Sequence, residues 1–166
     1  MGISYKTPPD LGRDIDGLGS LIAKYNKGEI AAVELKAHRV PFGVYEQRER
    51  DTYMVRIRCA AGIITPSQLE EVALLAAQYG RGVVHLTTRQ ELQIHYVKLG
   101  DIIPIIRKLK EAGLASLGGG GNTVRNITAQ EDAGIDNTEV FDVTPYAVAL
   151  TNRLIAEDDS WTLPRK

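Results

Sequence analysis

The chain of 166 residues is poor in cysteine and in large aromatic residues, and its charges nearly cancel. One cysteine, Cys59, excludes an internal disulfide framework and cannot supply the four thiolates that an iron–sulfur cluster normally takes. A formal net charge of −1 gives no global attraction for nucleic acid or anionic membranes, so an anion site must be a local cluster. Two phenylalanines and one tryptophan are too few for an RNA-binding sheet that stacks bases.

Long apolar runs are missing as well. No stretch approaches the ~20 residues that a membrane span needs, and the first residues lack the pattern of a signal peptide. Hydrophobic residues at 43% and charged residues at 25% are typical of a globular domain. We therefore expect a cytoplasmic protein with neither a membrane nor a nucleic-acid partner.

An alternating pattern predicts a strand over residues 52–59. One of its faces is apolar and includes Cys59, which we expect to be a buried thiol, while the other carries Arg56 and Arg58. The backbone positions of two arginines that are two residues apart on one strand lie roughly 7 Å apart. Their guanidinium groups can therefore clamp an anion between them. A solvated sheet face with ion pairs explains the same pattern.

A strong helix-start signal follows. Thr65 is expected as the N-cap, with Pro66 in the first turn and Gln68 completing a capping box, and Gly80 as the end. The expected buried stripe of this helix is Leu69, Val72, Ala73 and Ala76.

Two strands and a helix complete the predicted unit. The strands cover residues 83–87 and 91–97, and the helix runs from a cap at Asp101 to a stop at Gly113. Its expected core residues are Ile102, Ile105, Ile106 and Leu109. Strand, helix, two paired strands and helix predict an α+β, ferredoxin-like half-domain with an antiparallel sheet over residues 49–117.

The flanking segments are less regular. Residues 1–48 are predicted as an N-terminal arm and linker, with a short helix over 18–25 and an undecided segment over 29–37. Residues 118–166 begin with a glycine run and contain a helix that starts at Thr144.

The strand over residues 91–97 has a polar face. Gln93 and His95 point to one side and follow closely after Arg89, while Leu92, Ile94 and Tyr96 are expected in the core. Such a strand suits a large anion. A structural role for His95 is an equally open reading.

These motifs carry a family resemblance. Leu-Thr-Thr-Arg-Gln, then Gln-x-His, a glycine-rich loop and Thr-Val-Arg-Asn resemble the siroheme-dependent sulfite and nitrite reductases. Four further segments are similar to the family and occur in the same order as in the family: 42–48, 54–65, 142–146 and 163–166. The likeness therefore spans roughly residues 40–166. The resemblance implies the same ferredoxin-like fold for residues 49–117, and it implies that residues 118–166 are the truncated start of the siroheme/4Fe-4S domain.

The resemblance also implies roles for individual residues. The residues expected to bind the oxygens of sulfite or nitrite, and so to be catalytic, are Arg56, Arg125 and Lys166. Those expected to contact siroheme are Arg58, Thr88, Arg89, Gln93, His95 and Asn126. The implied cofactors are siroheme and a 4Fe-4S cluster whose ligands lie outside this chain.

Because the family pattern continues beyond Lys166, we expect an N-terminal fragment of a longer reductase, inactive alone. The whole enzyme would reduce sulfite to sulfide or nitrite to ammonia with six electrons from ferredoxin, a flavoprotein or a similar donor. An open alternative is a complete, non-catalytic module for siroheme or another anionic tetrapyrrole.

The apolar face that a half-domain exposes without its partner half also suggests a homodimer. One departure, the acidic segment over 130–132, is expected to weaken an anion pocket by like-charge repulsion.

Overall fold

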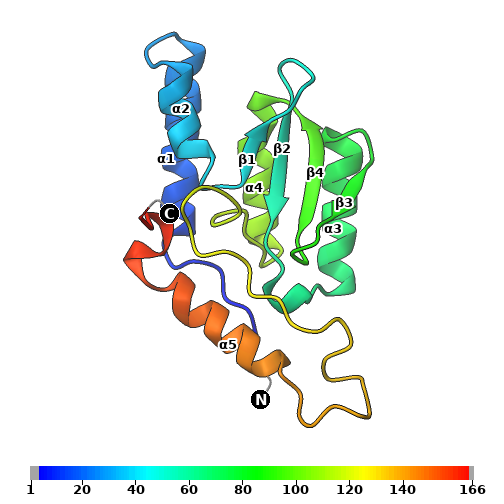
Figure 1. Ribbon diagram of the computed structural model, residues 1–166. Helices are drawn as coiled ribbons and strands as arrows, with labels where there is room; N and C mark the ends of the chain where they lie inside the picture. Colours follow the sequence, from blue (N-terminus) through cyan, green and yellow to red (C-terminus); the bar gives the residue numbers. More distant parts are fainter. Residues whose placement is uncertain (1–3, 165–166) are drawn as a thin grey trace.

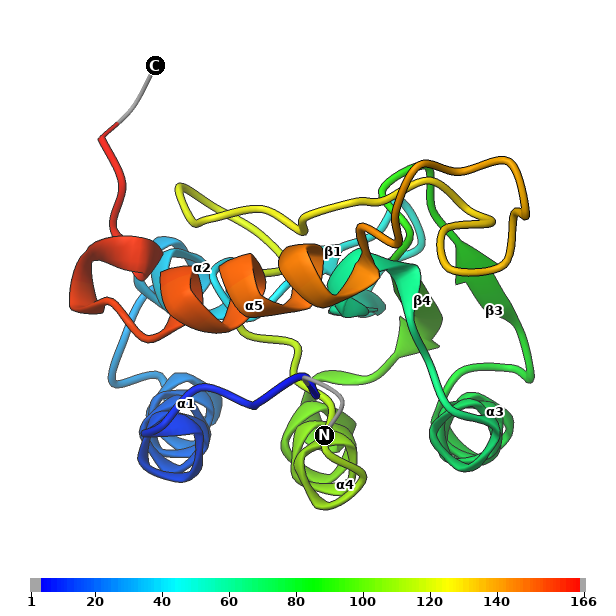
Figure 2. The ribbon, with the colours of Figure 1, turned by 90° about the horizontal axis from the view of Figure 1, so that it is seen from below.

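The computed structural model describes residues 4–164, which form one antiparallel sheet with a layer of helices over one face (Figures 1 and 2). The strands run in the order β1-β2-β4-β3. Their bounds are β1 Val44–Glu46, β2 Tyr53–Ile57, β3 Val84–Leu86 and β4 Leu92–Val97. The helices are α1 Leu11–Asn26, α2 Ala32–Arg39, α3 Pro66–Tyr79, α4 Ile102–Glu111 and α5 Thr144–Ile155. The predicted α+β fold with an antiparallel sheet is confirmed.

Figure 2 shows the layers. Helices α1, α4 and α3 lie side by side over one face of the sheet, and the segment after Gly118 passes along the other. Helix α5 lies beyond the lower end of the strands in Figure 1, where it contacts η1. Short 3-10 turns, η1 Ala60–Gly62, η2 Leu99–Asp101 and η3 Asp158–Trp161, connect these elements. The second face, called the front face below, therefore has no layer of helices like the one on the back.

Helix α3 begins as predicted. Thr65 and Gln68 form both hydrogen bonds of the capping box, and Pro66 occupies the first turn. The expected stripe is partly wrong, because Val72, Leu75 and Ala76 are the buried residues. Leu69 remains 46% exposed. The helix contacts β3, β4 and α4 along one side only, and that side is rotated from the predicted one.

The core of α4 is as predicted, with all four of its expected residues buried. The expected cap at Asp101 is wrong, since its side chain makes no capping hydrogen bond. The backbone of Asp101 is helical rather than extended, because residues 99–101 already form a 3-10 turn.

The N-terminal segment is more ordered than an arm. Helix α1 is longer than the predicted 18–25, and its residues Leu11, Ile15, Leu18 and Ile22 join the same buried cluster as the sheet. The undecided segment over 29–37 becomes α2, and β1 lies before the predicted boundary at residue 49.

Strand β4 contains a bulge. Tyr53 pairs with Val97 and Val55 with Ile94, so β4 has one extra residue between the two pairs. Tyr96 takes a φ of 63° at this point. The expectation that Tyr96 is a core residue is therefore wrong, because Val97 takes that position. No helix within residues 4–164 is long and apolar enough to cross a membrane.

Candidate anion-binding site

Two of the arginines predicted to bind substrate oxygens lie together on the front face. Arg56 projects from the middle of β2, and its Nη1 donates to the carbonyl oxygen of Gly119 at 3.2 Å. Arg125 comes from the loop beyond, and its Nη1 donates to the same oxygen at 3.3 Å. Residues far apart in the sequence thus place two guanidinium groups around one oxygen atom.

The glycine run makes this convergence possible. A Cβ at Gly120 would collide with the carbonyl oxygen of Val40 and with the ring of Tyr45, so the chain passes there only without a side chain. The hydroxyl of Tyr45 accepts a hydrogen bond from the amide of Gly121 at 3.1 Å. The loop is thereby fixed against the sheet, and the Gly119 carbonyl is held between the two arginines.

Gln93 lies beside Arg56 across the β2–β4 ladder. Its amide oxygen, in the orientation that the hydrogen bonds require, accepts from Arg56 Nη2 at 2.9 Å and from Nε at 3.1 Å. Its amide nitrogen then faces His85 Nδ1 and His95 Nε2, each at 3.2 Å. Gln93 and His95 share a face as predicted. His85 was missed, although its place opposite Gln93 follows from the pairing of β3 with β4.

Gln47 positions His95. The amide N–H of Tyr96, turned by the bulge, donates to Gln47 Oε1 at 2.6 Å, which leaves Gln47 Nε2 facing His95 Nδ1 at 2.9 Å. An amide nitrogen only donates, and both ring nitrogens of His95 face one, Nδ1 that of Gln47 at 2.9 Å and Nε2 that of Gln93 at 3.2 Å. A neutral imidazole accepts at one nitrogen only, and the shorter contact favours Nδ1 as the acceptor, with the proton on Nε2. Burial lowers the pKa of His95, and the neighbouring His85 adds to this, so the ring is neutral near pH 7.

Glu91 stands among the arginines. Its side chain is 3% exposed, and its Oε2 lies 3.7 Å from Arg56 Nε. Burial raises the pKa of Glu91, whereas Arg56, Arg58, Arg125 and Arg89 act to lower it. One carboxylate among four guanidinium groups leaves the region positive. This is the local cluster of positive charge that an anion site needs in a chain whose charges nearly cancel. The side chains of Arg56, Arg89, Arg125 and Glu91 are called the front cluster below.

The turn before β4 holds the remaining predicted contacts. Thr87 Oγ1 accepts from the amides of Arg89 at 3.2 Å and Glu91 at 3.1 Å, which shapes the turn. The side chains of Thr88 and Arg89 are exposed. Within residues 4–164, neither Arg89 nor Arg125 forms an ion pair, so both guanidinium groups are available to a ligand.

Asn126 ties the loop to this turn. Its Nδ2 donates to the carbonyl oxygens of Cys59 and Arg89, each at 2.8 Å. Gln90 adds a second tie, because its amide makes two hydrogen bonds with the backbone of Ala129 at 2.7 and 3.1 Å. These contacts hold Arg125 and Arg89 at a fixed separation. Sequence reasoning gave Gln90 no role, since its partner is distant in the chain.

Arg58 does not join Arg56 in an open clamp. It is 0% exposed, and its Nη2 donates to the carbonyl oxygens of Val124 at 2.6 Å and Gly118 at 3.1 Å. Strand β2 ends at Ile57, and the loop folds over the residue that follows. Lys166, the third predicted catalytic residue, lies outside the described residues. Glu131, in the acidic departure, is exposed and forms no ion pair with the cluster in the part of the chain described.

Cys59 is buried, as predicted, and burial raises its pKa to about 11. Among residues 4–164 no three His, Cys, Asp or Glu side chains are arranged to hold a metal ion.

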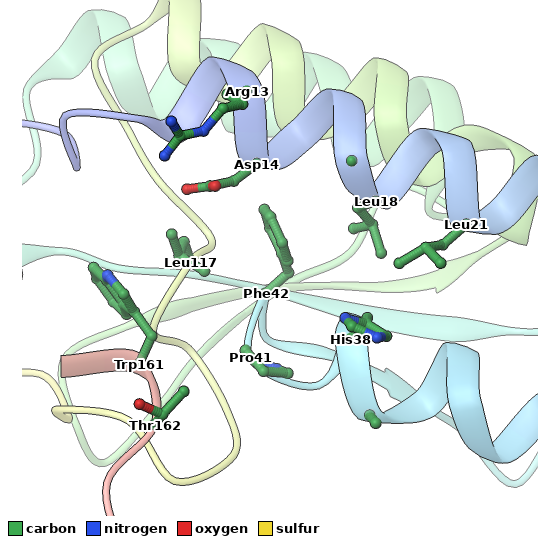
Figure 3. Close-up of a pocket in the computed structure, with 12 residues that line it drawn as sticks. Arg13, Asp14, Leu18, Leu21, His38, Pro41, Phe42, Leu117, Trp161 and Thr162 are labelled. Atoms are coloured by element: carbon green, nitrogen blue, oxygen red, sulfur yellow. The ribbon is translucent and has the colours of Figure 1, made fainter. Parts of the chain in front are cut away.

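The cavity in Figure 3, of about 620 Å³, lies between α1, α2 and Trp161 and is largely apolar. None of the predicted site residues within 4–164 lines it. The chemistry of the front face therefore rests on its arginines, amides and imidazoles.

Comparisons with known proteins bear on the family and the fold. Residues 45–112 match the family described as "Nitrite/Sulfite reductase ferredoxin-like half domain". The assimilatory ferredoxin-dependent nitrite reductase of Haloferax mediterranei is 35% identical over 137 residues, covering 75% of this chain and 23% of that protein. The ferredoxin–nitrite reductase of Leptolyngbya laminosa is 37% identical over 119 residues, covering 69% and 23%.

A solved structure shares the fold. The structure of the Mycobacterium tuberculosis NirA protein superposes with a TM-score of 0.79 at 23% identity, over 98% of this chain and 34% of that one. The chain spans about a quarter of the length of the curated relatives it matches. By sequence, residues 45–112 belong to the nitrite/sulfite reductase family as its ferredoxin-like half domain.

Proposed function

We propose that this chain forms part of a siroheme-dependent nitrite reductase that receives electrons from ferredoxin, and that its front face binds the substrate anion and the cofactor's carboxylates. The observation that carries the proposal is the convergence of Arg56 and Arg125 on the carbonyl oxygen of Gly119. Nitrite is favoured over sulfite, and ferredoxin over other donors, because the similar proteins named above are ferredoxin-dependent nitrite reductases.

The two arginines suit a small oxyanion. Guanidinium groups are planar, always charged and able to donate paired hydrogen bonds to neighbouring oxygens. Arg56 is held by Gln93 and Glu91, and Arg125 by the loop, so neither needs to be ordered when an anion arrives. Fixed positive charge around the substrate oxygens stabilises the negative charge that builds up as N–O bonds break.

The donor set also fits siroheme. The tetrapyrrole has eight carboxylates, and burying them without partners is costly. Arg89 and Arg125 have no ion-pair partner in the described residues, and Gln93 and His95 present amide and N–H groups on the same face. Bound siroheme would supply the iron that takes the substrate nitrogen and passes electrons to it. The single cysteine, buried and with a raised pKa, leaves the ligands of any 4Fe-4S cluster to other parts of the enzyme.

The test uses the full-length reductase. We expect Arg56→Lys and Arg125→Lys each to lower kcat/KM for nitrite by at least ~100-fold, because a lysine keeps the charge but loses the paired donors. Siroheme content should stay near that of the native enzyme. The control is Arg153→Gln, which changes an exposed arginine of α5. Native activity in both lysine variants would refute the assignment, and equal loss in the control would refute its specificity.

A further inference from the structure

A second cavity, of about 290 Å³, lies between the N-terminal segment, α5 and the end of β2. It is lined by Ser4, Tyr5, Arg58, Cys59, Ala60, Ile63, Thr65, Gln68, Gly113, Leu114 and Val148. No carboxylate is among these residues. Among the residues that the structure describes, the one charged side chain in its wall is therefore a cation, Arg58.

The cation in this wall is only partly paired. Arg58 is 0% exposed, yet hydrogen bonds reach only its Nη2. Within residues 4–164, its Nε and Nη1 are buried without a hydrogen-bond partner. A guanidinium group stays protonated in proteins, and burying its charge without a counter-charge is costly. The nearby carboxylate of Glu91 already faces Arg56 at 3.7 Å, so its charge is shared.

A tyrosine adds a further donor. The hydroxyl of Tyr5 is buried and has no partner in the described part of the chain. Burial raises the pKa of Tyr5 to about 12, so the hydroxyl keeps its proton at neutral pH. The backbone on either side is fixed, because Asn152 of α5 donates to the carbonyl oxygen of Ser4 at 2.8 Å and accepts from the amide of Lys6 at 2.9 Å.

We propose that this cavity binds one small monovalent anion, a halide or nitrite, between the free N–H groups of Arg58 and the hydroxyl of Tyr5. Water could satisfy the hydrogen bonds, but it would leave the positive charge uncompensated. The volume admits such an anion with a few waters and excludes a tetrapyrrole. The bound anion would fix the loop at Gly118 and Val124, whose carbonyl oxygens Arg58 also holds.

Bromide is the probe, because it can be located by anomalous diffraction. We expect an anomalous peak in contact with Arg58 and Tyr5 in crystals soaked in sodium bromide. In solution, bromide should raise the midpoint of thermal unfolding at constant ionic strength, with gluconate as the balancing anion that is too large to enter. Tyr5→Phe should bind bromide about tenfold more weakly, because one hydrogen bond to a charged group is lost. Arg58→Met should remove the anomalous peak from the cavity and lower the thermal response to bromide.

Two controls separate this site from other effects. Tyr146→Phe removes the hydroxyl of an exposed tyrosine on α5 and should respond like the native protein. Arg125→Gln weakens anion binding on the front face and should leave the anomalous bromide peak beside Arg58 and Tyr5 in place. If Arg58→Met fails to fold, the test rests on two other measurements: the bromide affinity of Tyr5→Phe and the anomalous map of the native protein. A cavity that holds only water, or equal bromide responses in native protein and Tyr5→Phe, would overturn the proposal.

Discussion

Among single residues, Glu91 has the largest influence on how strongly the front cluster attracts an anion. It is a buried carboxylate beside Arg56, where a ligand's negative charge is also expected. Because burial raises its pKa, Glu91 gains a proton at a higher pH than an ordinary glutamate as the pH falls. Protonation removes the like charge, so anion affinity should rise as pH is lowered through that pKa.

The corresponding variant is Glu91→Gln. We expect it to bind nitrite about tenfold more tightly at pH 7 and to lose the pH dependence, since the amide keeps the shape without the charge. Calorimetric titration between pH 5 and 8 measures both. Glu70→Gln, on the exposed side of α3, is the control. Weaker binding by Glu91→Gln would show that the carboxylate instead orders Arg56.

Gln47 makes a different kind of residue-scale prediction, because it selects a tautomer. We expect ¹⁵N NMR to show neutral His95 with its proton on Nε2. Gln47→Glu should move the proton to Nδ1 and raise the pKa of His95, because a carboxylate accepts where the amide donated. His85 serves as an internal reference in the same spectra. A native ring already protonated at Nδ1 would contradict the geometry.

At the scale of elements, the glycine loop is the part that tolerates change least. Gly120→Ala forces the new Cβ against the backbone of Val40. We expect a loss of about 1–3 kcal/mol in the free energy of unfolding, together with weaker anion binding as Gly119 shifts. Gly17→Ala, in open space on α1, should instead stabilise by about 0.5–1 kcal/mol. Denaturant unfolding compares them, and equal effects would refute the steric argument.

Element boundaries show what sequence reasoning can reach. The capping box of α3 and the apolar stripe of α4 were predicted because both are encoded by neighbours within one or two turns. The bulge at Tyr96 and the burial of Arg58 were not. Each depends on a distant segment: Gln47 fastens the bulge, and the loop from Gly118 covers Arg58.

For the site as well, some features could be predicted from the sequence and others could not. The polar face of β4 and the positions of Arg56 and Arg125 in their motifs could be predicted from local pattern and resemblance. Their meeting at Gly119 could not, because it requires the loop to cross the sheet. Gln47 and His85 lie in the site because of how the strands pair, and the sequence alone does not determine that pairing.

For the whole molecule, the open edge of the sheet is the expected contact surface of a homodimer. Strand β3 is an edge strand, and Leu86 on it is 75% exposed. We expect self-association that Leu86→Lys weakens about tenfold, since a charge would be buried in the contact. Val33→Lys, equally exposed on α2, is the control. Light scattering decides, and a native monomer at high micromolar concentration would contradict the prediction.

The central claim that we propose is that the front face binds the carboxylates of an anionic tetrapyrrole beside the two arginines that bind the substrate anion. The most direct measurement is a titration of the chain with siroheme, followed by the cofactor's absorption, for native protein, Arg89→Gln and the control Arg153→Gln. We predict equal affinities for native protein and control, and about tenfold weaker binding by Arg89→Gln. An unchanged affinity in Arg89→Gln, or no binding by the native chain, would contradict the account.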